Sequence, residues 1–225
     1  MTFSIVGYCQ ETGMLGVAIT TSSICVGARC PHARASVGAV STQNITDPSL
    51  APALLNRLES GMPADQALGD LLENTENQEY RQLIVVDNTG NSACHTGSKI
   101  LGIHAESKGI HCHAAGNLLA NDRVPEAMTN MFGSLTDVHL GERLMKSLEA
   151  GLYEGGEMGD VHSAALLVVD RQSFPLVDLR VDWADVGPAS NLRSLWQAYQ
   201  PQMQDYLTRA LSPADAPSYG VPGDE

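Results

Sequence analysis

The sequence contains few basic residues. Lysine occurs three times, at Lys99, Lys108 and Lys146, and the 13 Lys and Arg residues are set against 26 Asp and Glu residues. Because binding of nucleic-acid phosphates needs clustered Lys and Arg, the net charge of -13 argues against a nucleic-acid partner. Any catalytic lysine would have to be one of these three residues.

Long apolar runs are missing as well. No stretch of about 18 consecutive apolar residues is present, so we expect no membrane-spanning helix and no membrane partner. The first residues lack the basic region that opens a signal peptide, which predicts a cytoplasmic protein. The five cysteines, an odd number, are then expected to be reduced thiols.

Familiar catalytic and cofactor motifs are also absent. The sequence has no Gly-x-Ser-x-Gly elbow, and no glycine-rich segment carries the Lys-Ser/Thr of a phosphate-binding loop. Two groups of possible metal ligands, Cys25, Cys30 and His32 in one loop and His111 with His113 in another segment, do not have the spacing of a recognised zinc site. We therefore predict no cofactor and no metal. Because alternate residues of a strand share a face, a metallohydrolase using His111 and His113 is kept as a third hypothesis.

The hydrophobic pattern predicts an α+β protein with one domain, residues 1–211. Blocks of strands joined by short antiparallel turns alternate with pairs of helices, which is not the order of a doubly wound sheet. The Pro/Gly-rich end, residues 212–225, is predicted to be a disordered tail. The predicted strands are residues 2–8, 15–22, 35–42, 82–87, 92–96, 109–115, 163–169 and 176–181, and the predicted helices are residues 47–60, 64–75, 123–132, 138–150 and 190–210.

Two of the predicted strands, residues 15–20 and 163–169, are apolar throughout. A strand of this kind is typical of a sheet that is covered on both faces. Two antiparallel sheets stacked on each other, with a helix pair on each outer face, would bury strands in this way. The sequence therefore predicts a four-layer α-β-β-α sandwich.

The first predicted strand begins directly after Met1, with Thr2 as its first residue. Removal of Met1 by an aminopeptidase would leave a threonine hydroxyl and a free α-amine on one residue. Threonine with an N-terminal amine is one way of building an activated nucleophile. The alternative is that Thr2 is an ordinary strand residue without a chemical role.

The order of these elements resembles that of the N-terminal nucleophile hydrolases, which include proteasome subunits. Several segments over residues 2–196 also resemble the domain-of-unknown-function 1028 family. This resemblance implies the N-terminal nucleophile hydrolase-like fold and no established activity. The chain departs from the family pattern at residues 159–162 and 183–185. The segments that carry the resemblance are Thr2-Phe3-Ser4-Ile5-Val6, Gly38-Ala39-Val40-Ser41-Thr42-Gln43, Arg81-Gln82-Leu83, Val85-Val86-Asp87, Thr96-Gly97, Gly116-Asn117, Ser163-Ala164-Ala165-Leu166-Leu167-Val168-Val169 and Asp178-Leu179-Arg180-Val181-Asp182.

Hydroxyl residues end the second predicted strand, among them Thr21 and Ser23. If the first two strands form a hairpin, this end lies near the start of the first strand. Thr21 and Ser23 would then orient Thr2 or a substrate. The alternative is that these hydroxyls satisfy backbone groups of a turn.

Two arginines and three amide side chains complete the candidate site. Arg29 and Arg34 would fix a substrate carboxylate or lower the pKa of the α-amine, and the alternative for them is a surface or ion-pair role. Asn44 and Asn117 each follow a predicted strand and are candidates for an oxyanion hole, whereas turn formation is the alternative. Gln43, beside Asn44, is a candidate for substrate binding.

These residues lead to two main hypotheses of different class. The first is an amide or peptide-bond hydrolase of small substrates, with Thr2 as nucleophile after removal of Met1. The alternative is a non-catalytic ligand-binding or scaffold protein on the same fold, because Met1 can be retained and the acidic and lysine partners of Thr2 are missing. A homo-oligomer is expected in either case.

Overall fold

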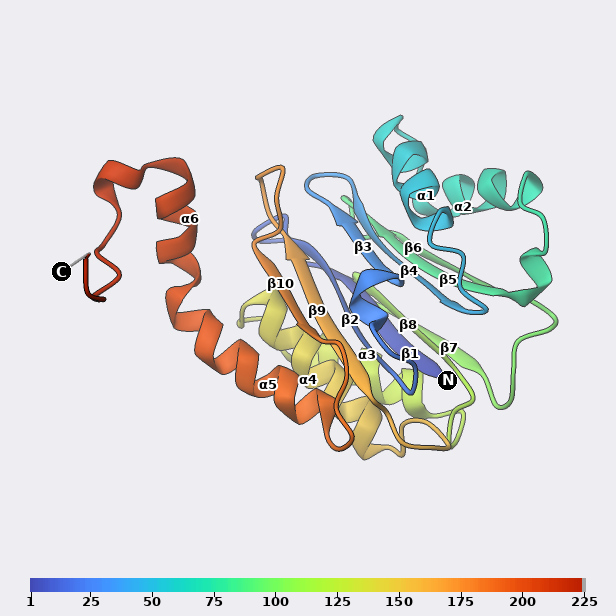
Figure 1. Cartoon of the computed structure of the whole chain (residues 1–225). Helices are drawn as coiled ribbons and strands as arrows, with labels where there is room; N and C mark the ends of the chain where they lie inside the picture. Colours follow the sequence, from blue (N-terminus) through green and yellow to red (C-terminus); the bar gives the residue numbers. More distant parts are fainter. Residues whose placement is uncertain (224–225) are drawn as a thin grey trace.

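The computed structural model describes residues 1–223, and within them ten strands form two antiparallel sheets (Figure 1). This confirms the predicted α+β class with two antiparallel sheets. The six-stranded sheet has the order β10 (Val177–Val181), β9 (Ser163–Val169), β2 (Leu15–Thr21), β1 (Thr2–Tyr8), β8 (Cys112–Asn117) and β7 (Ala105–Gly109). The four-stranded sheet has the order β3 (Pro31–Arg34), β4 (Gly38–Asn44), β5 (Arg81–Asp87) and β6 (Ser92–Thr96).

The hairpin of β1 and β2 forms the centre of the six-stranded sheet. Its turn contains Gly13 at a φ of 80°, a backbone conformation that favours glycine. Pairing of β1 on both sides places Thr2 opposite Thr21 of β2 and opposite Asn117 of β8. The sheet therefore brings three polar residues from distant parts of the chain to one edge.

Helices cover one face of each sheet (Figure 1). The helices α1 (Leu50–Glu59) and α2 (Ala64–Glu73) bury a row of leucines against β4 and β5. The helices α3 (Val124–Ser134), α4 (Leu140–Tyr153) and α5 (Pro188–Tyr199) pack on the six-stranded sheet, around the fully buried side chains of Phe3, Phe132 and Trp196. The alternation of apolar residues along these helices places one stripe toward the sheet.

The remaining faces of the two sheets lie against each other. Small and β-branched side chains fill most of this space, because facing sheets approach closely only where the side chains between them are compact. Toward the Thr2 end, the apolar side chains give way to polar ones. The apolar cluster between the sheets consists of Val6, Leu15, Val17, Ala39, Ile84, Val86, Ala115 and Val169.

Two strands are missing from the sequence prediction. The edge strand β3 begins with Pro31, which removes a backbone donor and weakens the strand pattern. The edge strand β7 alternates partly buried and exposed residues, and its sequence Ala-Glu-Ser-Lys-Gly has little strand propensity. The strand β4 begins at Gly38, because the chain turns at Ser36 with a φ of 61°.

The last predicted helix, residues 190–210, is divided in the structure. It consists of α5, a short 3-10 segment at Gln200–Gln202, and α6 (Met203–Leu211). Pro201 interrupts the continuous helix because it lacks a backbone N–H and its ring clashes with the preceding turn. The helix α6 extends away from the two sheets, as Figure 1 shows in red.

The segment after α6 returns toward this helix. The guanidinium group of Arg209 donates to the carbonyl of Pro217 at 3.0 Å and lies 3.8 Å from the ring centre of Tyr219. The disordered tail expected for residues 212–225 stays a prediction, and its residues 224–225 lie outside the described residues. Within the described chain, no helix combines the length and apolar character needed to cross a membrane.

Candidate functional site

The hydroxyl of Thr2 lies in a group of oxygen atoms at the end of β1. Thr2 is 6% exposed, and its Oγ1 lies 3.1 Å from Oγ1 of Thr21. The Thr2 hydroxyl donates to the carbonyl oxygen of Met1 at 2.5 Å, and the Thr21 hydroxyl donates to the same carbonyl oxygen. The antiparallel hairpin thus places Thr21 beside Thr2, as its pairing predicts. Both hydroxyls are directed at the first peptide bond.

Asn117 lies on the other side of Thr2, and its amide has a fixed orientation. Its Nδ2 donates to Oε1 of Gln82 at 3.1 Å, which directs its Oδ1 away from Gln82. This Oδ1 is buried and has no hydrogen-bond partner within residues 1–223. A buried acceptor without a donor is costly in a folded protein, and such groups are concentrated at functional sites. The side chain of Asn117 therefore offers an acceptor oxygen beside Thr2.

A layer of polar side chains connects the two sheets behind Thr2. Ser4 donates from its hydroxyl to Oε1 of Gln43 at 2.7 Å. Gln43 then donates from Nε2 to Oε1 of Gln82 at 2.8 Å and to the carbonyl of Ala115 at 3.1 Å. These side chains are buried, so their mutual hydrogen bonds replace those they would make with water. The predicted binding residue Gln43 is therefore part of the support for Asn117.

Glu157 brings a carboxyl group to the same region. The segment that contains it pairs with the residues following β8, through a bridge between Glu157 and Leu119. Glu157 is 6% exposed, and Ser22 is a polar neighbour of its carboxyl group, which forms no ion pair in the described chain. Burial raises its pKa to about 8, whereas the N-terminal amine and the nearby Ser22 lower it by smaller amounts. A carboxyl group of this kind can hold or release a proton near neutral pH.

The side chain of Met1 occupies the space in front of this group. A Cβ atom added at Gly159 would lie 3.2 Å from Cε of Met1, so the methionine side chain lies directly on the backbone there. His162 closes the nearby edge, where its backbone N–H donates to the carbonyl of Thr21 at 2.8 Å. Its ring stacks on the half-exposed ring of Trp183 at 4.4 Å. Gly159 and His162 belong to residues 159–162 and Trp183 belongs to residues 183–185, the two segments at which the sequence departs from the family pattern.

The structure brings Ser23 near this site but leaves its hydroxyl exposed. The backbone N–H of Ser23 donates to Oγ1 of Thr21 at 3.3 Å, and its carbonyl accepts from the hydroxyl of Ser163 at 2.6 Å. The predicted Arg29 donates to the carbonyl of Ile24 at 2.6 Å. Both residues therefore stabilise the loop after β2.

The other predicted site residues are not placed beside Thr2. Arg34 forms an ion pair with Glu59 at 2.6 Å, at the end of β3 that packs near the opposite end of β1. Asn44 has a φ of 71°, and its Nδ2 donates to the carbonyl of Tyr80 at 2.8 Å. This is the turn-forming role that the sequence allows for Asn44.

The two histidines of the third hypothesis are separated by the turn before β8. His111 has a φ of 61°, and its ring contacts Gln10 at 3.2 Å and the ring of Tyr8 edge-on. His113 lies on β8 and faces the space between the sheets, like its strand partner Val6. The two rings therefore have different surroundings and do not form a ligand pair.

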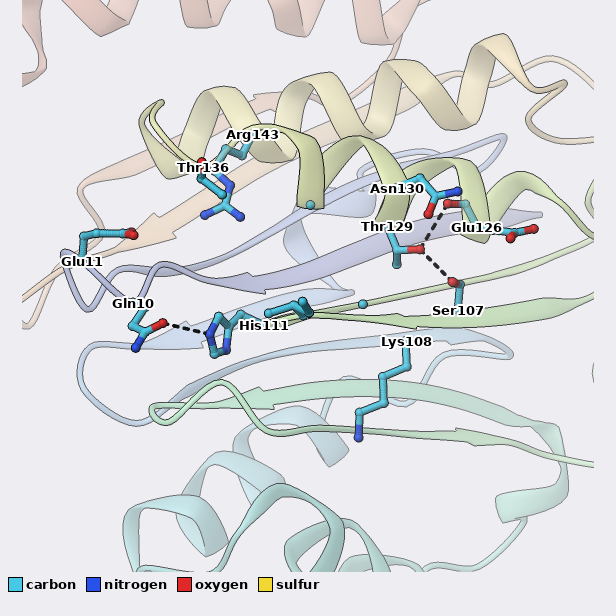
Figure 2. A pocket seen from close by; sticks show the side chains of 13 residues that line it. Gln10, Glu11, Ser107, Lys108, His111, Glu126, Thr129, Asn130, Thr136 and Arg143 are labelled. Atoms are coloured by element: carbon cyan, nitrogen blue, oxygen red, sulfur yellow. Dashed lines mark hydrogen bonds between the residues drawn. The ribbon is translucent and has the colours of Figure 1, made fainter.

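A cavity of about 540 Å³ lies at the other end of β1, between α3, α4 and the β7–β8 turn (Figure 2). Its wall includes Arg143, which is 6% exposed and whose guanidinium lies 3.9 Å from the ring centre of Phe132. Thr129 and Ser107 face each other across the cavity edge, with their hydroxyl oxygens 2.7 Å apart. Since β1 spans about 20 Å, this cavity is separate from the group around Thr2.

Fold and site together define an α+β protein of two antiparallel sheets with a buried hydroxyl group at the start of its central strand. The chain belongs to a family of unknown function, DUF1028, whose model matches residues 2–192. No match was found among curated proteins.

Solved structures include a close relative of this chain. The crystal structure of a DUF1028 protein from Silicibacter pomeroyi is 30% identical, with a TM-score of 0.82 over 88% of this chain and 89% of that chain. Anbu (ancestral beta-subunit) from Yersinia bercovieri is 9% identical, with a TM-score of 0.42 over 90% of this chain and 96% of that chain. A Gly-1 mutant of Anbu from Hyphomicrobium sp. strain MC1 is 13% identical, with a TM-score of 0.45 over the same shares.

Sequence reasoning missed Glu157 and Gln82. Glu157 follows two glycines, Gly155 and Gly156, both at positive φ, and this unusual pair marks a tight turn that aims the next residue. Gln82 is a polar residue at the start of an otherwise apolar strand, which is a signal for a buried hydrogen bond. Neither signal says which distant residues these side chains contact.

Proposed function

We propose that this protein hydrolyses amide or peptide bonds of small substrates, with Thr2 as nucleophile after removal of Met1. One observation carries the proposal: the hydroxyls of Thr2 and Thr21 converge on the first peptide bond, beside the unpartnered Oδ1 of Asn117 and the buried carboxyl group of Glu157. Two antiparallel sheets with helices on their outer faces support it, because the N-terminal nucleophile hydrolases that the sequence resembles are expected to combine sheets and helices in this way.

Removal of Met1 would supply the base. The backbone nitrogen of Thr2 would become a free α-amine on the residue that carries the nucleophilic hydroxyl. Glu157 would lie near this amine, since its carboxyl already interacts with the N-terminal charge. The carboxyl group and the α-amine would then titrate as a coupled pair.

The reaction then proceeds in two balanced steps. Oγ1 of Thr2 attacks the substrate carbonyl carbon, and the proton of the hydroxyl passes to the α-amine. The C–N bond breaks as the α-amine returns this proton to the leaving nitrogen, which leaves an ester on Thr2. A water molecule, deprotonated by the same amine, attacks the ester, releases a carboxylic acid and restores the hydroxyl.

The neighbouring groups have distinct parts in this proposal. The Thr21 hydroxyl, which donates to the Met1 carbonyl, would donate to the substrate oxyanion in the same position. The unpartnered Oδ1 of Asn117 would accept from a substrate N–H or from the α-amine. The space of the Met1 side chain beside Gly159 would receive the acyl side of a small substrate.

The mass of the purified protein and two variants of Thr2 test the proposal. We expect an intact mass without Met1 and labelling of Thr2 by a hydroxyl-reactive electrophile. On a panel of small amides and dipeptides, Thr2→Ala should lower kcat/KM at least about 10³-fold, whereas Thr2→Ser keeps a hydroxyl and should retain activity. Equal activity of wild type and Thr2→Ala would contradict the proposal, and so would complete retention of Met1.

The cavity of Figure 2 favours a second candidate function, the non-catalytic binding of a small ligand. The cavity has the size of a ligand site, and the buried Nε of Arg143 has no partner among residues 1–223. An anionic ligand would satisfy this guanidinium. Binding that is lost in Arg143→Met and retained in Thr2→Ala, without turnover in the wild type, would favour this function over hydrolysis.

A further inference from the structure

We propose that Cys94, Glu106 and His113 form a binding site for a divalent transition-metal ion of the zinc type. The site lies between the edges of the two sheets, away from Thr2. Cys94 comes from β6 of the four-stranded sheet, and Glu106 and His113 come from β7 and β8 of the six-stranded sheet.

Strand register directs the three side chains into one space. Cys94 pairs with Ile84, Glu106 pairs with Ala115, and His113 pairs with Val6. Directly paired residues of antiparallel strands share a face, and Ile84, Ala115 and Val6 all belong to the apolar cluster between the sheets. Sγ of Cys94, a carboxylate oxygen of Glu106 and a ring nitrogen of His113 lie within 4.8 Å of one another. Bonds of 2.0–2.3 Å to a central ion require only a small further approach.

His113 is the strongest single indication of a ligand. The residue is 4% exposed, and its Nε2 is buried without a hydrogen-bond partner in the described part of the chain. Its Nδ1 lies 3.3 Å from the hydroxyl oxygen of Ser92. A metal-binding histidine typically donates its other ring N–H to such an oxygen, which fixes the ring and leaves a lone pair for the ion.

Binding of a metal ion would change the protonation of Cys94, because a metal binds the thiolate form of cysteine. A bound cation would displace the thiol proton into solvent and neutralise the resulting thiolate.

The charge of Lys108 is part of the same surroundings. Lys108 shares the Glu106 face of β7, and its Nζ donates to the carbonyl of Ser92 at 2.9 Å. Figure 2 shows this side chain directed away from the cavity and toward the second sheet. The ammonium balances Glu106 while the thiol is protonated. The Cys94 thiolate, the Glu106 carboxylate, the Lys108 ammonium and a divalent ion together carry a net charge of +1. Solvent around the exposed Glu106 can stabilise this charge.

The donor set selects among metals. A thiolate and an imidazole favour Zn²⁺ and Co²⁺ over the hard cations Mg²⁺ and Ca²⁺, which prefer oxygen ligands. Three protein ligands leave a fourth position, and the exposed Glu106 admits water there. The site is independent of the proposed hydrolysis, because His113 and Asn117 are four residues apart on β8, about 13 Å.

Titration with Co²⁺ tests the site, because a cobalt–thiolate bond gives a charge-transfer absorption band. The full chain is reduced, treated with a chelator and titrated. We expect one equivalent of Co²⁺ to produce this band and Zn²⁺ to remove it by competition. The band should be absent in Cys94→Ser and retained in Cys25→Ser, a matched control in the loop after β2. Ser92→Ala should weaken affinity about 10- to 100-fold.

Thermal unfolding with and without Zn²⁺ provides a second test of the site in case Cys94→Ser folds poorly. Glu106→Gln changes an exposed side chain, and this variant is expected to fold, to bind Co²⁺ more weakly and to lose the rise in Tm that Zn²⁺ gives the wild type. Absence of the charge-transfer band in folded wild type would overturn the proposal. A band that persists in Cys94→Ser, or disappears equally in Cys25→Ser, would also overturn it.

Discussion

Oε1 of Gln82 accepts a hydrogen bond from Nδ2 of Asn117 at 3.1 Å, across the boundary between the two sheets. The same oxygen accepts from Gln43 at 2.8 Å. The side-chain amide of Gln82, in the four-stranded sheet, therefore orients Asn117, which pairs with Thr2 in the six-stranded sheet. The direction in which Asn117 presents its free oxygen depends on this contact.

Replacement of Gln82 by leucine is expected to destabilise the protein. The change leaves the amide donors of Gln43 and Asn117 without an acceptor in a buried place, which costs about 1–3 kcal/mol for each unsatisfied group. Urea unfolding of Gln82→Leu measures this loss. The matched control is Gln66→Leu on the exposed face of α2, which should change the free energy of unfolding little. Equal effects of the two changes would contradict the buried network.

Glu157 is expected to make stability depend on pH. Its pKa rises from an ordinary 4.5 to about 8 on burial, so the folded protein keeps a proton that the unfolded chain has lost. The free energy of unfolding should therefore fall as pH rises from about 4.5 to about 8. Glu157→Gln should remove this dependence, and above pH 8 its free energy of unfolding should exceed that of the wild type by at most about 5 kcal/mol.

Urea unfolding over this pH range is the measurement for Glu157. The exposed Glu76→Gln serves as the control, and its stability profile should run parallel to that of the wild type. If Glu157→Gln also runs parallel to the wild type, the carboxyl is not buried as the structure describes.

Gly7 is expected to tolerate no side chain. A Cβ atom there would lie 2.6 Å from a ring carbon of Phe132, which is fully buried under α4. Forcing an extra methyl group into a packed core costs about 1–3 kcal/mol, and Gly7→Ala should lower Tm accordingly. Gly69→Ala is the control, because nothing lies within 4 Å of that helical position and alanine favours a helix by up to about 1 kcal/mol. A raised Tm in Gly7→Ala would show that the packing is looser than described.

Arg193 is expected to hold α5 to α4. Its guanidinium donates to Glu142 at 2.6 Å and to both carboxylate oxygens of Glu149, at 2.7 and 2.8 Å. Trp196 also donates to Glu142 at 2.7 Å. Arg193→Ala should cost about 1–3 kcal/mol in urea unfolding, because charge-assisted bonds of a largely shielded side chain are lost.

The control for Arg193 is Arg171→Ala. Arg171 is 79% exposed and lies 3.9 Å from Asp170, so its removal should change stability by less than about 1 kcal/mol. If both variants lose the same stability, the network between α4 and α5 contributes no more than a surface ion pair.

Local sequence patterns were enough to predict most of the fold. The hairpin of β1 and β2 follows from its apolar strands and from Gly13 in the turn, and its pairing brings Thr21 to Thr2. The strands β3 and β7 were not predicted, because β3 begins with a proline and the sequence Ala-Glu-Ser-Lys-Gly of β7 has little strand propensity. Pro201 was a visible reason to divide the last helix.

The candidate site was only partly predictable. Thr2 and Asn117 pair at one edge of the six-stranded sheet. Arg34 lies in an ion pair with Glu59, and Asn44, although it follows Gln43 at the end of β4, donates its side-chain amide to the carbonyl of Tyr80. Glu157 arrives through a bridge to Leu119 from a segment beyond two helices. Such contacts depend on how distant elements pack together, and the spacing of residues along the sequence does not reveal this packing.

The hydrogen bonds between Ser4, Gln43 and Ala115 have a mechanical consequence. Apolar faces can slide past each other at small cost, because dispersion contacts are non-directional, but amide groups bond in one relative position. These hydrogen bonds therefore fix the relative position of the two sheets at the Thr2 end. Substitutions in the apolar part of this interface are therefore expected to leave the spacing between β1 and β4 at Thr2 unchanged.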